Sequence, residues 1–175
     1  MRATAGERPE AVFSNFQGRY RAARTFREAT FDGMTPTTQR AYNSLMRLGL
    51  SYAALESLCS ALRRPVAREP LLSHDIATRL RDSRSTQLAE VMRTDVDRPL
   101  AARLTTLLET VDTEDVMPAA SFFRHKFFHG ALTASRSGAA REWERRIVDD
   151  LADLLLSSAD DRFADYVDAG VSRLP

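Results

Sequence analysis

The sequence predicts an all-α fold, a bundle of four to five long helices with one or two short inserted helices. Apolar residues recur at helical spacing along nearly the whole chain, and no segment of useful length alternates with period two as a half-buried strand does. Pro9, Pro36 and Pro99 stand where a proline suits the first turn of a helix. The 175 residues, 43% of them apolar, suffice for one core. We therefore expect a single domain over residues 1–175, with residues 1–8 as a flexible N-terminus.

Two long helices are expected in the first part of the chain. The first covers about residues 10–31, where Phe13, Phe16 and Tyr20 belong to one apolar stripe, and Gly33 breaks it. The second begins at Thr35-Pro36 and has the longest uninterrupted pattern. Its apolar stripe consists of Ala41, Tyr42, Leu45, Leu48, Tyr52, Leu55, Leu58 and Leu62.

Further helical segments follow the proline-containing break at residues 63–70. They are expected at residues 74–82, 86–94, 99–111, 118–132 and 139–155. Ser73 is positioned to cap the first of these segments, and the acidic turn at residues 112–115 ends the third. The pattern leaves open whether the last helix continues to Val167 after the serine pair at residues 157–158.

The composition excludes several classes of protein. A formal net charge of +1 means that any affinity for nucleic acid must come from a local patch. The single cysteine, Cys59, cannot form an internal disulfide, and its apolar neighbours suit a buried thiol. The N-terminus lacks the apolar core of a signal peptide, and no run of about 18 apolar residues could span a bilayer. We therefore expect a cytoplasmic protein with no membrane contact.

Arginine dominates the basic residues: Lys126 is the only lysine among 25 lysines and arginines. Guanidinium groups bind phosphate in a bidentate manner, but arginines scattered over every predicted helix cannot all do so. Codon bias explains this composition, and we interpret it as background.

Residues 122–130 hold the densest cluster of titratable side chains, with two of the three histidines, an arginine and the lysine between four phenylalanines. Histidine exchanges protons near neutral pH, and two cations beside it suggest acid/base chemistry on an anionic substrate such as a phosphodiester. At 100° per residue, His125 and His129 lie one turn apart on the same helix face, whereas Arg124 lies about 140° from His129, on the apolar side. Arg124 can therefore meet the pair only through its long side chain, a helix distortion or a second subunit.

Two other interpretations of the histidine pair remain open. It can be a hydrogen-bonded element of a helix interface, with the aromatic residues as ordinary core. It can also be half of a metal site, but the helical metalloprotease motif needs a glutamate directly after the first histidine, where this chain has Lys126. The third histidine, His74, is distant in sequence. We expect no metal and no other cofactor.

Arg124, His125 and His129 resemble the R-(x)4–6-H signature of the HEPN superfamily, in which the residue after the arginine is commonly Asn, Asp or His. Gly130 and the apolar residues around the motif are also common in that superfamily. The resemblance extends to the architecture, an all-α bundle in which the motif lies late in the chain beside the final helix.

The resemblance implies a metal-independent endoribonuclease that cuts RNA by attack of the ribose 2′-hydroxyl and leaves a cyclic phosphate. His129 would be the general acid/base, Arg124 would bind the scissile phosphate, and His125 would orient it. Two subunits of that family usually bring their motifs together across a two-fold axis. A homodimer would also allow Arg124 of one subunit to complete the site of the other.

The family includes toxins paired with antitoxins, defence ribonucleases, and modules that bind RNA or protein without cutting. The resemblance therefore implies RNA and a cognate antitoxin protein as partners, and it leaves open a non-catalytic helical RNA-binding or protein-interaction module. Lys126, Arg136 and Arg141 would add contacts to RNA phosphates.

Overall fold

The structure of the chain, a computed structural model, describes residues 9–82, 98–128 and 142–171. The described residues form six α-helices and one short 3-10 helix, and the only extended pairing among them is an isolated bridge, so the predicted all-α class is confirmed. The elements are α1 (Pro9–Thr25), α2 (Pro36–Ala61), η1 (Val66–Arg68), α3 (His74–Asp82), α5 (Arg98–Glu109), α6 (Met117–Phe128) and α7 (Glu142–Val171).

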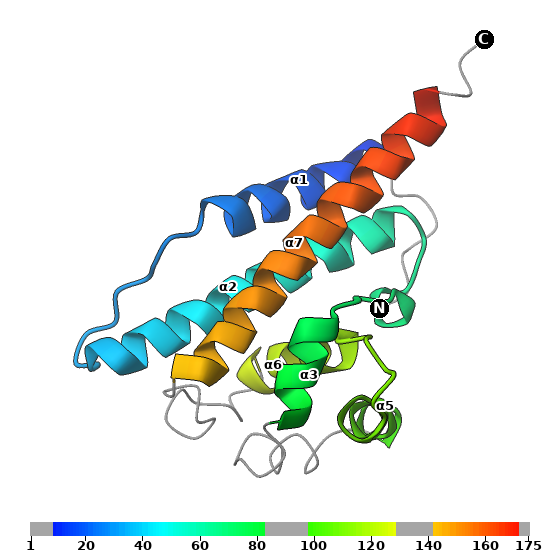
Figure 1. Cartoon of the computed structure of the whole chain (residues 1–175). Coiled ribbons are helices and arrows are strands. Elements are labelled where there is room, and N and C mark those ends of the chain that lie inside the picture. The colour runs from blue at the N-terminus through cyan, green and yellow to red at the C-terminus, as the bar shows by residue number, and fades with distance from the viewer. Residues whose placement is uncertain (1–8, 83–97, 129–141, 172–175) are drawn as a thin grey trace.

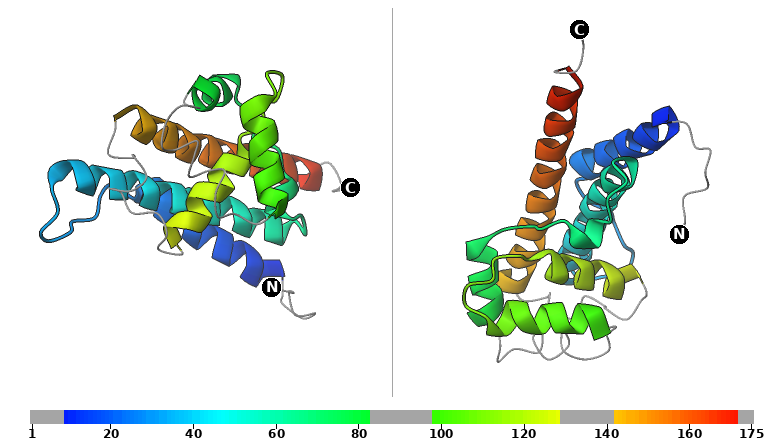
Figure 2. Two further views of the ribbon diagram at one scale, coloured as in Figure 1. Left: turned by 90° about the horizontal axis from the view of Figure 1, so that it is seen from below. Right: turned by 90° about the vertical axis from the view of Figure 1, so that its right-hand side faces the viewer.

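The three longest helices, α1, α2 and α7, run along one another, with α2 packed against both of the others (Figure 1). The shorter helices α3, α5 and α6 gather at one end of this group, and α6 crosses α2 (Figure 2). The late position of α6 in the chain therefore does not separate it from the first half, because it rests directly on α2.

One hydrophobic core joins these helices. Leu48, Leu55 and Leu58 of α2 are fully buried against residues of α7 such as Leu151, and Phe122 of α6 closes the same cluster. Burying one such side chain contributes about 1.5–3 kcal/mol to folding. The apolar stripe predicted for α2 is the face that enters this core, and Cys59 is buried beside it as expected.

The predicted first helix is too long at its C-terminal end. α1 ends at Thr25, whereas the apolar pattern extended the helix to Phe31. The backbone N–H of Ala29 donates to the side-chain oxygen of Asn43 in α2 at 2.8 Å, and the Phe31 ring packs against the Tyr42 ring with centroids 5.6 Å apart. The backbone N–H of Ala29 thus bonds to α2 instead of to a preceding helical turn, whereas Phe26 still donates to the carbonyl of Ala22 at 2.9 Å.

The cap of α3 agrees with the sequence, and the structure decides the extent of the last helix, which the apolar pattern leaves open. The hydroxyl of Ser73 accepts the backbone N–H of Ile76 at 3.3 Å and so caps α3 as predicted. α7 continues without a break through Ser158, whose hydroxyl accepts a hydrogen bond from Arg162 at 3.1 Å. The predicted helix at residues 86–94 and the expected flexible residues 1–8 lie outside the described residues.

A short antiparallel pairing sets the position at which α6 begins. Ser73 donates its backbone N–H to the carbonyl of Glu114 at 2.9 Å, and Val116 donates to Leu71 at 2.8 Å. The carboxylate of Asp115 accepts the backbone N–H groups of Leu71 at 3.1 Å and of Met117, the first residue of α6, at 3.0 Å. The start of α6 is thus tied to the segment that follows η1.

The turn after α5 is held by a buried arginine of α3. The Arg81 guanidinium donates to the carbonyls of Leu107 at 3.4 Å, Thr110 at 3.2 Å and Thr113 at 2.8 Å. Carbonyls at a helix C-terminus lack partners within the helix, and a cation satisfies both their hydrogen bonds and their partial negative charge. Arg81 therefore connects α3, α5 and the turn that leads to α6.

Candidate active site

The side chains of α6 divide between the core and solvent. Phe122 and Phe123 are fully buried, and Lys126 is 5% exposed. Arg124 is half-buried at the side of the helix, and His125 is exposed. The helical positions thus separate Arg124 from His125, as the 100° spacing predicts.

Arg124 lies against α2 rather than in open solvent. Its guanidinium carbon is 5.6 Å from the centroid of the Tyr52 ring, and its Nη2 is 3.6 Å from Oε2 of Glu56. A cation over an aromatic face is attracted by the ring quadrupole, and a carboxylate nearby adds to that attraction. The Arg124 side chain is nevertheless 38% exposed. A guanidinium that is positioned in this way can exchange its carboxylate partner for a phosphate oxygen.

Tyr52 supplies a neutral platform for this arginine. The residue is buried, and its hydroxyl lies 3.2 Å from the hydroxyl of Ser121 in α6, where either oxygen can donate. Burial is the main cause that raises the pKa of Tyr52 above its ordinary value of 10, and the carboxylate of Glu56 acts in the same direction. The phenol therefore stays protonated at neutral pH and links α2 to α6.

The end of α6 is seated on α2 at a glycine. A Cβ atom at Gly49 would lie 2.3 Å from Cε2 of Phe128, so a side chain there would displace the ring. The Phe127 ring contacts Phe128 with centroids 5.3 Å apart and Tyr42 of α2 at 6.1 Å. The absence of a side chain at position 49 thus lets the last described turn of α6 approach α2 closely.

The predicted site residues do not all fall within the described part of the chain. Arg124 and His125 are described and lie on neighbouring sides of α6. His129, Arg136 and Arg141 lie outside the described residues. Lys126 is predicted as a phosphate contact, but its burial leaves little of the side chain accessible to RNA in this arrangement.

Sequence reasoning missed the partners of Arg124 on α2. The sequence places Tyr52 in the apolar stripe of that helix, which is correct for its ring, and it indicates no role for Glu56. The two residues are four positions apart and therefore neighbours on one face of α2. The sequence shows the four-residue spacing of Tyr52 and Glu56. It does not indicate that α6 packs on the face of α2 that carries them.

Two further findings concern metals and membranes. Within residues 9–82, 98–128 and 142–171, no group of three or more His, Cys, Asp or Glu side chains is arranged to hold a metal ion. Among the described helices, none combines the length and the apolar character needed to cross a membrane.

Comparison with known proteins finds no matching family model, no matching curated protein and no matching solved structure.

Proposed function

We propose that the chain is a metal-independent endoribonuclease of the HEPN type, acting in the cytoplasm as a toxin or a defence ribonuclease. The observation that carries the proposal is the position of Arg124, a half-exposed cation supported by Tyr52, next to the exposed His125. His125 in turn precedes His129 by one helical turn in the sequence.

These residue types suit in-line cleavage of a phosphodiester. His129 takes the proton from the ribose 2′-hydroxyl, and the 2′-oxygen then attacks the phosphorus. The bond from phosphorus to the 5′-oxygen breaks, the leaving oxygen takes the proton that His129 carries, and a 2′,3′-cyclic phosphate remains. Arg124 stabilises the negative charge that develops on the phosphate, and His125 orients that group.

The proposal includes a homodimer that binds RNA and a cognate antitoxin protein. Because Arg124 faces Tyr52 while His125 faces solvent, one chain separates the cation from the histidine face. A second subunit related by a two-fold axis can bring an arginine and a histidine of different chains to one phosphate.

One observation favours a second candidate, a non-catalytic helical module that binds RNA or protein. Arg124 already has a carboxylate partner in Glu56 and an aromatic partner in Tyr52. An arginine that only joins α6 to α2 makes the same contacts. In this alternative, the histidines are polar residues of an interaction surface.

A cleavage assay on mixed cellular RNA in the presence of a chelator separates the candidates. The ribonuclease is expected to produce fragments that end in 2′,3′-cyclic phosphate, and RNA with 2′-O-methyl ribose is expected to stay intact. His129→Ala and Arg124→Ala should each lower the rate by at least about 100-fold with the helical fold kept.

His74→Ala is the matched control. His74 is exposed, lies in α3 and pairs with Glu114 at 3.2 Å, away from the residues of the motif. Its removal should leave cleavage nearly unchanged. Retained activity in both His129→Ala and Arg124→Ala would overturn the assignment, and RNA binding without any cleavage by the wild-type chain would favour the non-catalytic module.

A further inference from the structure

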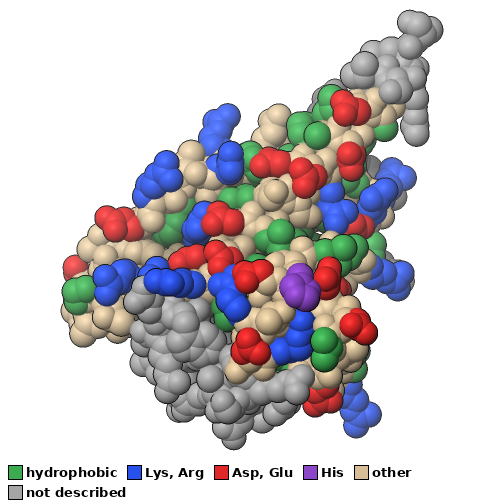
Figure 3. All heavy atoms as spheres, in the orientation of Figure 1, with side chains coloured by type: hydrophobic (Ala, Val, Ile, Leu, Met, Phe, Trp, Pro, Cys, Tyr) green, Lys and Arg blue, Asp and Glu red, His purple; other side chains and the backbone are tan. Residues whose placement is uncertain are grey.

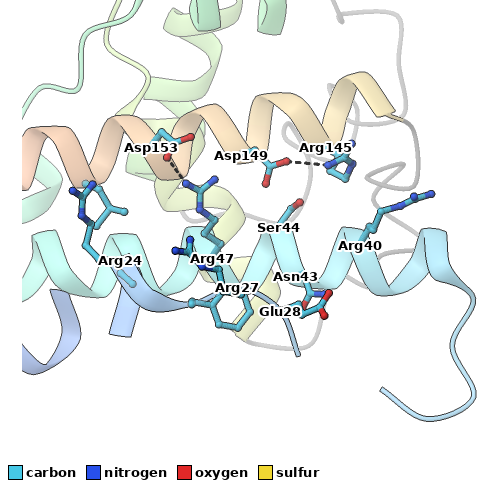
Figure 4. A pocket seen from close by; sticks show the side chains of 13 residues that line it. Arg24, Arg27, Glu28, Arg40, Asn43, Ser44, Arg47, Arg145, Asp149 and Asp153 are labelled. Carbon is cyan, nitrogen blue, oxygen red and sulfur yellow. Dashed lines mark hydrogen bonds and ion pairs between the residues drawn. The ribbon is translucent and has the colours of Figure 1, made fainter. Parts of the chain in front are cut away.

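A pocket of about 670 Å³ opens between α1, the connector after it, α2 and α7 (Figure 4). Five arginines line it: Arg24, Arg27, Arg40, Arg47 and Arg145. They come from separate parts of the chain. Their grouping could therefore not be predicted from a sequence in which arginine is common throughout. Elsewhere, on the face shown in Figure 3, basic and acidic side chains are interspersed. The fold therefore concentrates guanidinium groups at this pocket.

The charges of the pocket lining do not cancel. Its carboxylates are Glu28, Asp149 and Asp153, three against five arginines. Asp153 pairs with Arg47, and Asp149 pairs with Arg145 at 3.2 Å (Figure 4). These two ion pairs neutralise both aspartates and hold two of the guanidinium groups in place.

Arg27 and Arg40 are in a different situation. Both are exposed, and within the part of the chain that the structure describes neither guanidinium has a carboxylate at ion-pair distance. Arg40 projects from α2, and Arg27 belongs to the connector that the side chain of Asn43 fixes through the backbone of Ala29. Arg24, the fifth arginine of the lining, lies over the Tyr20 ring, with its guanidinium carbon 5.9 Å from the ring centroid. Arg27 and Arg40 are therefore the two arginines of the lining for which the described residues supply neither a carboxylate nor an aromatic partner, and both are positioned by α2.

The floor of the pocket is buried and uncharged. Ala23 of α1 and Leu156 of α7 are buried there in one small cluster with Ala54, and Ser44 of α2 is buried beside them. A volume of this size lies in the range of sites that hold small molecules. Guanidinium groups in such a setting recognise planar or tetrahedral oxyanions through charge-assisted hydrogen bonds.

The pocket lies on the side of α2 that faces away from the motif. Arg47 lines the pocket and Glu56 contacts Arg124. The two positions are nine residues apart in the sequence, which places their side chains about 180° apart around an ideal helix. A ligand in the pocket would therefore occupy a site separate from the candidate active site.

We propose that this pocket binds a ligand through its phosphate groups, with Arg27 and Arg40 as the principal contacts. The chemistry is that of a phosphate ester of nucleotide size, which a free nucleotide or a phosphodiester backbone supplies. The proposal does not depend on ribonuclease activity, because none of the pocket residues belongs to the motif.

The test measures binding of two probes by isothermal titration calorimetry at fixed salt: adenosine triphosphate, and a short single-stranded RNA with 2′-O-methyl ribose that cannot be cleaved. The double variant Arg27→Gln/Arg40→Gln is expected to weaken binding at least about tenfold, since each lost charge-assisted contact contributes to affinity. If the double variant loses affinity for adenosine triphosphate, the site binds a free nucleotide. If it loses affinity for the RNA, the site binds the phosphodiester backbone of a nucleic acid.

Two further variants make the result specific. Arg68→Gln/Arg98→Gln removes the same charge from exposed positions in η1 and α5, outside the pocket lining, and should bind as the wild type does. Asp153→Asn removes the carboxylate that neutralises Arg47 and should tighten binding. Equal losses in the two double variants, or no binding of either probe by the wild type, would overturn the proposal. Thermal unfolding followed by circular dichroism verifies that each variant is folded.

Discussion

Arg124 of α6 and Tyr52 of α2 form a cation–π contact, with the guanidinium carbon 5.6 Å from the ring centroid. The contact joins two residues that are far apart in the sequence and lie at the interface between α2 and α6. It places the cation of the motif toward α2, whereas the neighbouring His125 is exposed. The arginine and the histidine of the motif thus belong to different surroundings, and each can be tested separately.

Removing the carboxylate beside Arg124 should strengthen RNA binding. Glu56 lies 3.6 Å from the Arg124 guanidinium and competes with a phosphate for it. Glu56→Gln is expected to lower KM for RNA by up to about fivefold, the upper end for an exposed ion pair, with kcat retained. The measurement is steady-state cleavage of a labelled RNA.

Asp161→Asn is the control for Glu56→Gln, because it removes one negative charge from an exposed position in α7. It should leave KM unchanged. If Glu56→Gln weakens cleavage instead, Glu56 supports the fold or the reaction, and the competition argument fails.

Two inactive variants should complement each other if the site is shared between subunits. In a mixture of Arg124→Ala and His129→Ala chains, heterodimers retain one intact pair, formed by Arg124 of one chain and His129 of the other. Part of the wild-type cleavage rate should therefore return on mixing. Light scattering checks that dimers form, and recovery of activity by monomers would contradict the composite site.

Arg81 should be important for stability but not for chemistry. It is buried and donates to three carbonyls at the end of α5 and in the turn that follows. Arg81→Met leaves these carbonyls without their donor, and we expect a loss of about 2–4 kcal/mol in the free energy of unfolding, measured in urea. Arg68→Met changes an exposed arginine of η1 and should cost much less. Equal losses in the two variants would contradict the role given to Arg81.

Stability should fall as the pH rises above 9. Burial raises the pKa of the Cys59 thiol from 9.0 to about 11, and burial also raises the pKa of Tyr52 above 10. Between pH 9 and 11 the unfolded chain loses the thiol proton while the folded chain keeps it. Ionisation therefore stabilises the unfolded state and lowers the free energy of unfolding. The contribution of Cys59 is present in full below pH 9 and is lost toward pH 11. Urea unfolding at several pH values should show a shallower decline for Cys59→Ala; an unchanged slope would refute this assignment.

The helices could be predicted from sequence where one buried face dominates the pattern. In α2 the stripe from Leu45 to Leu58 repeats over many turns, and the predicted start at Pro36 agrees with the structure. The local pattern of residues 26–31 also predicts a helix. Their actual conformation depends on Asn43 and Tyr42 of another helix, which a local pattern does not contain.

The candidate site was predictable only as a set of residue types. The motif indicated Arg124 and His125, but their environment depends on which face of α2 receives α6. That choice depends on shape, including the missing side chain at Gly49 that admits Phe128. The arginine pocket could not be predicted from the sequence either, because its residues come from separate segments and arginine is common throughout the chain.

The pairing between residues 71–73 and 114–116 limits where the chain can change in length. Its hydrogen bonds join Leu71 to Val116 and Ser73 to Glu114 in a fixed register. One residue inserted next to Asp115 would shift that register and rotate every following side chain of α6, Arg124 included, by about 100°. An insertion at the exposed Val111 leaves the spacing from Asp115 to Arg124 unchanged, but it separates Thr110 from Thr113, whose carbonyls both accept from Arg81. Sequences that keep this arrangement are therefore expected to keep constant both the length of the turn that Arg81 holds and the spacing from Asp115 to Arg124.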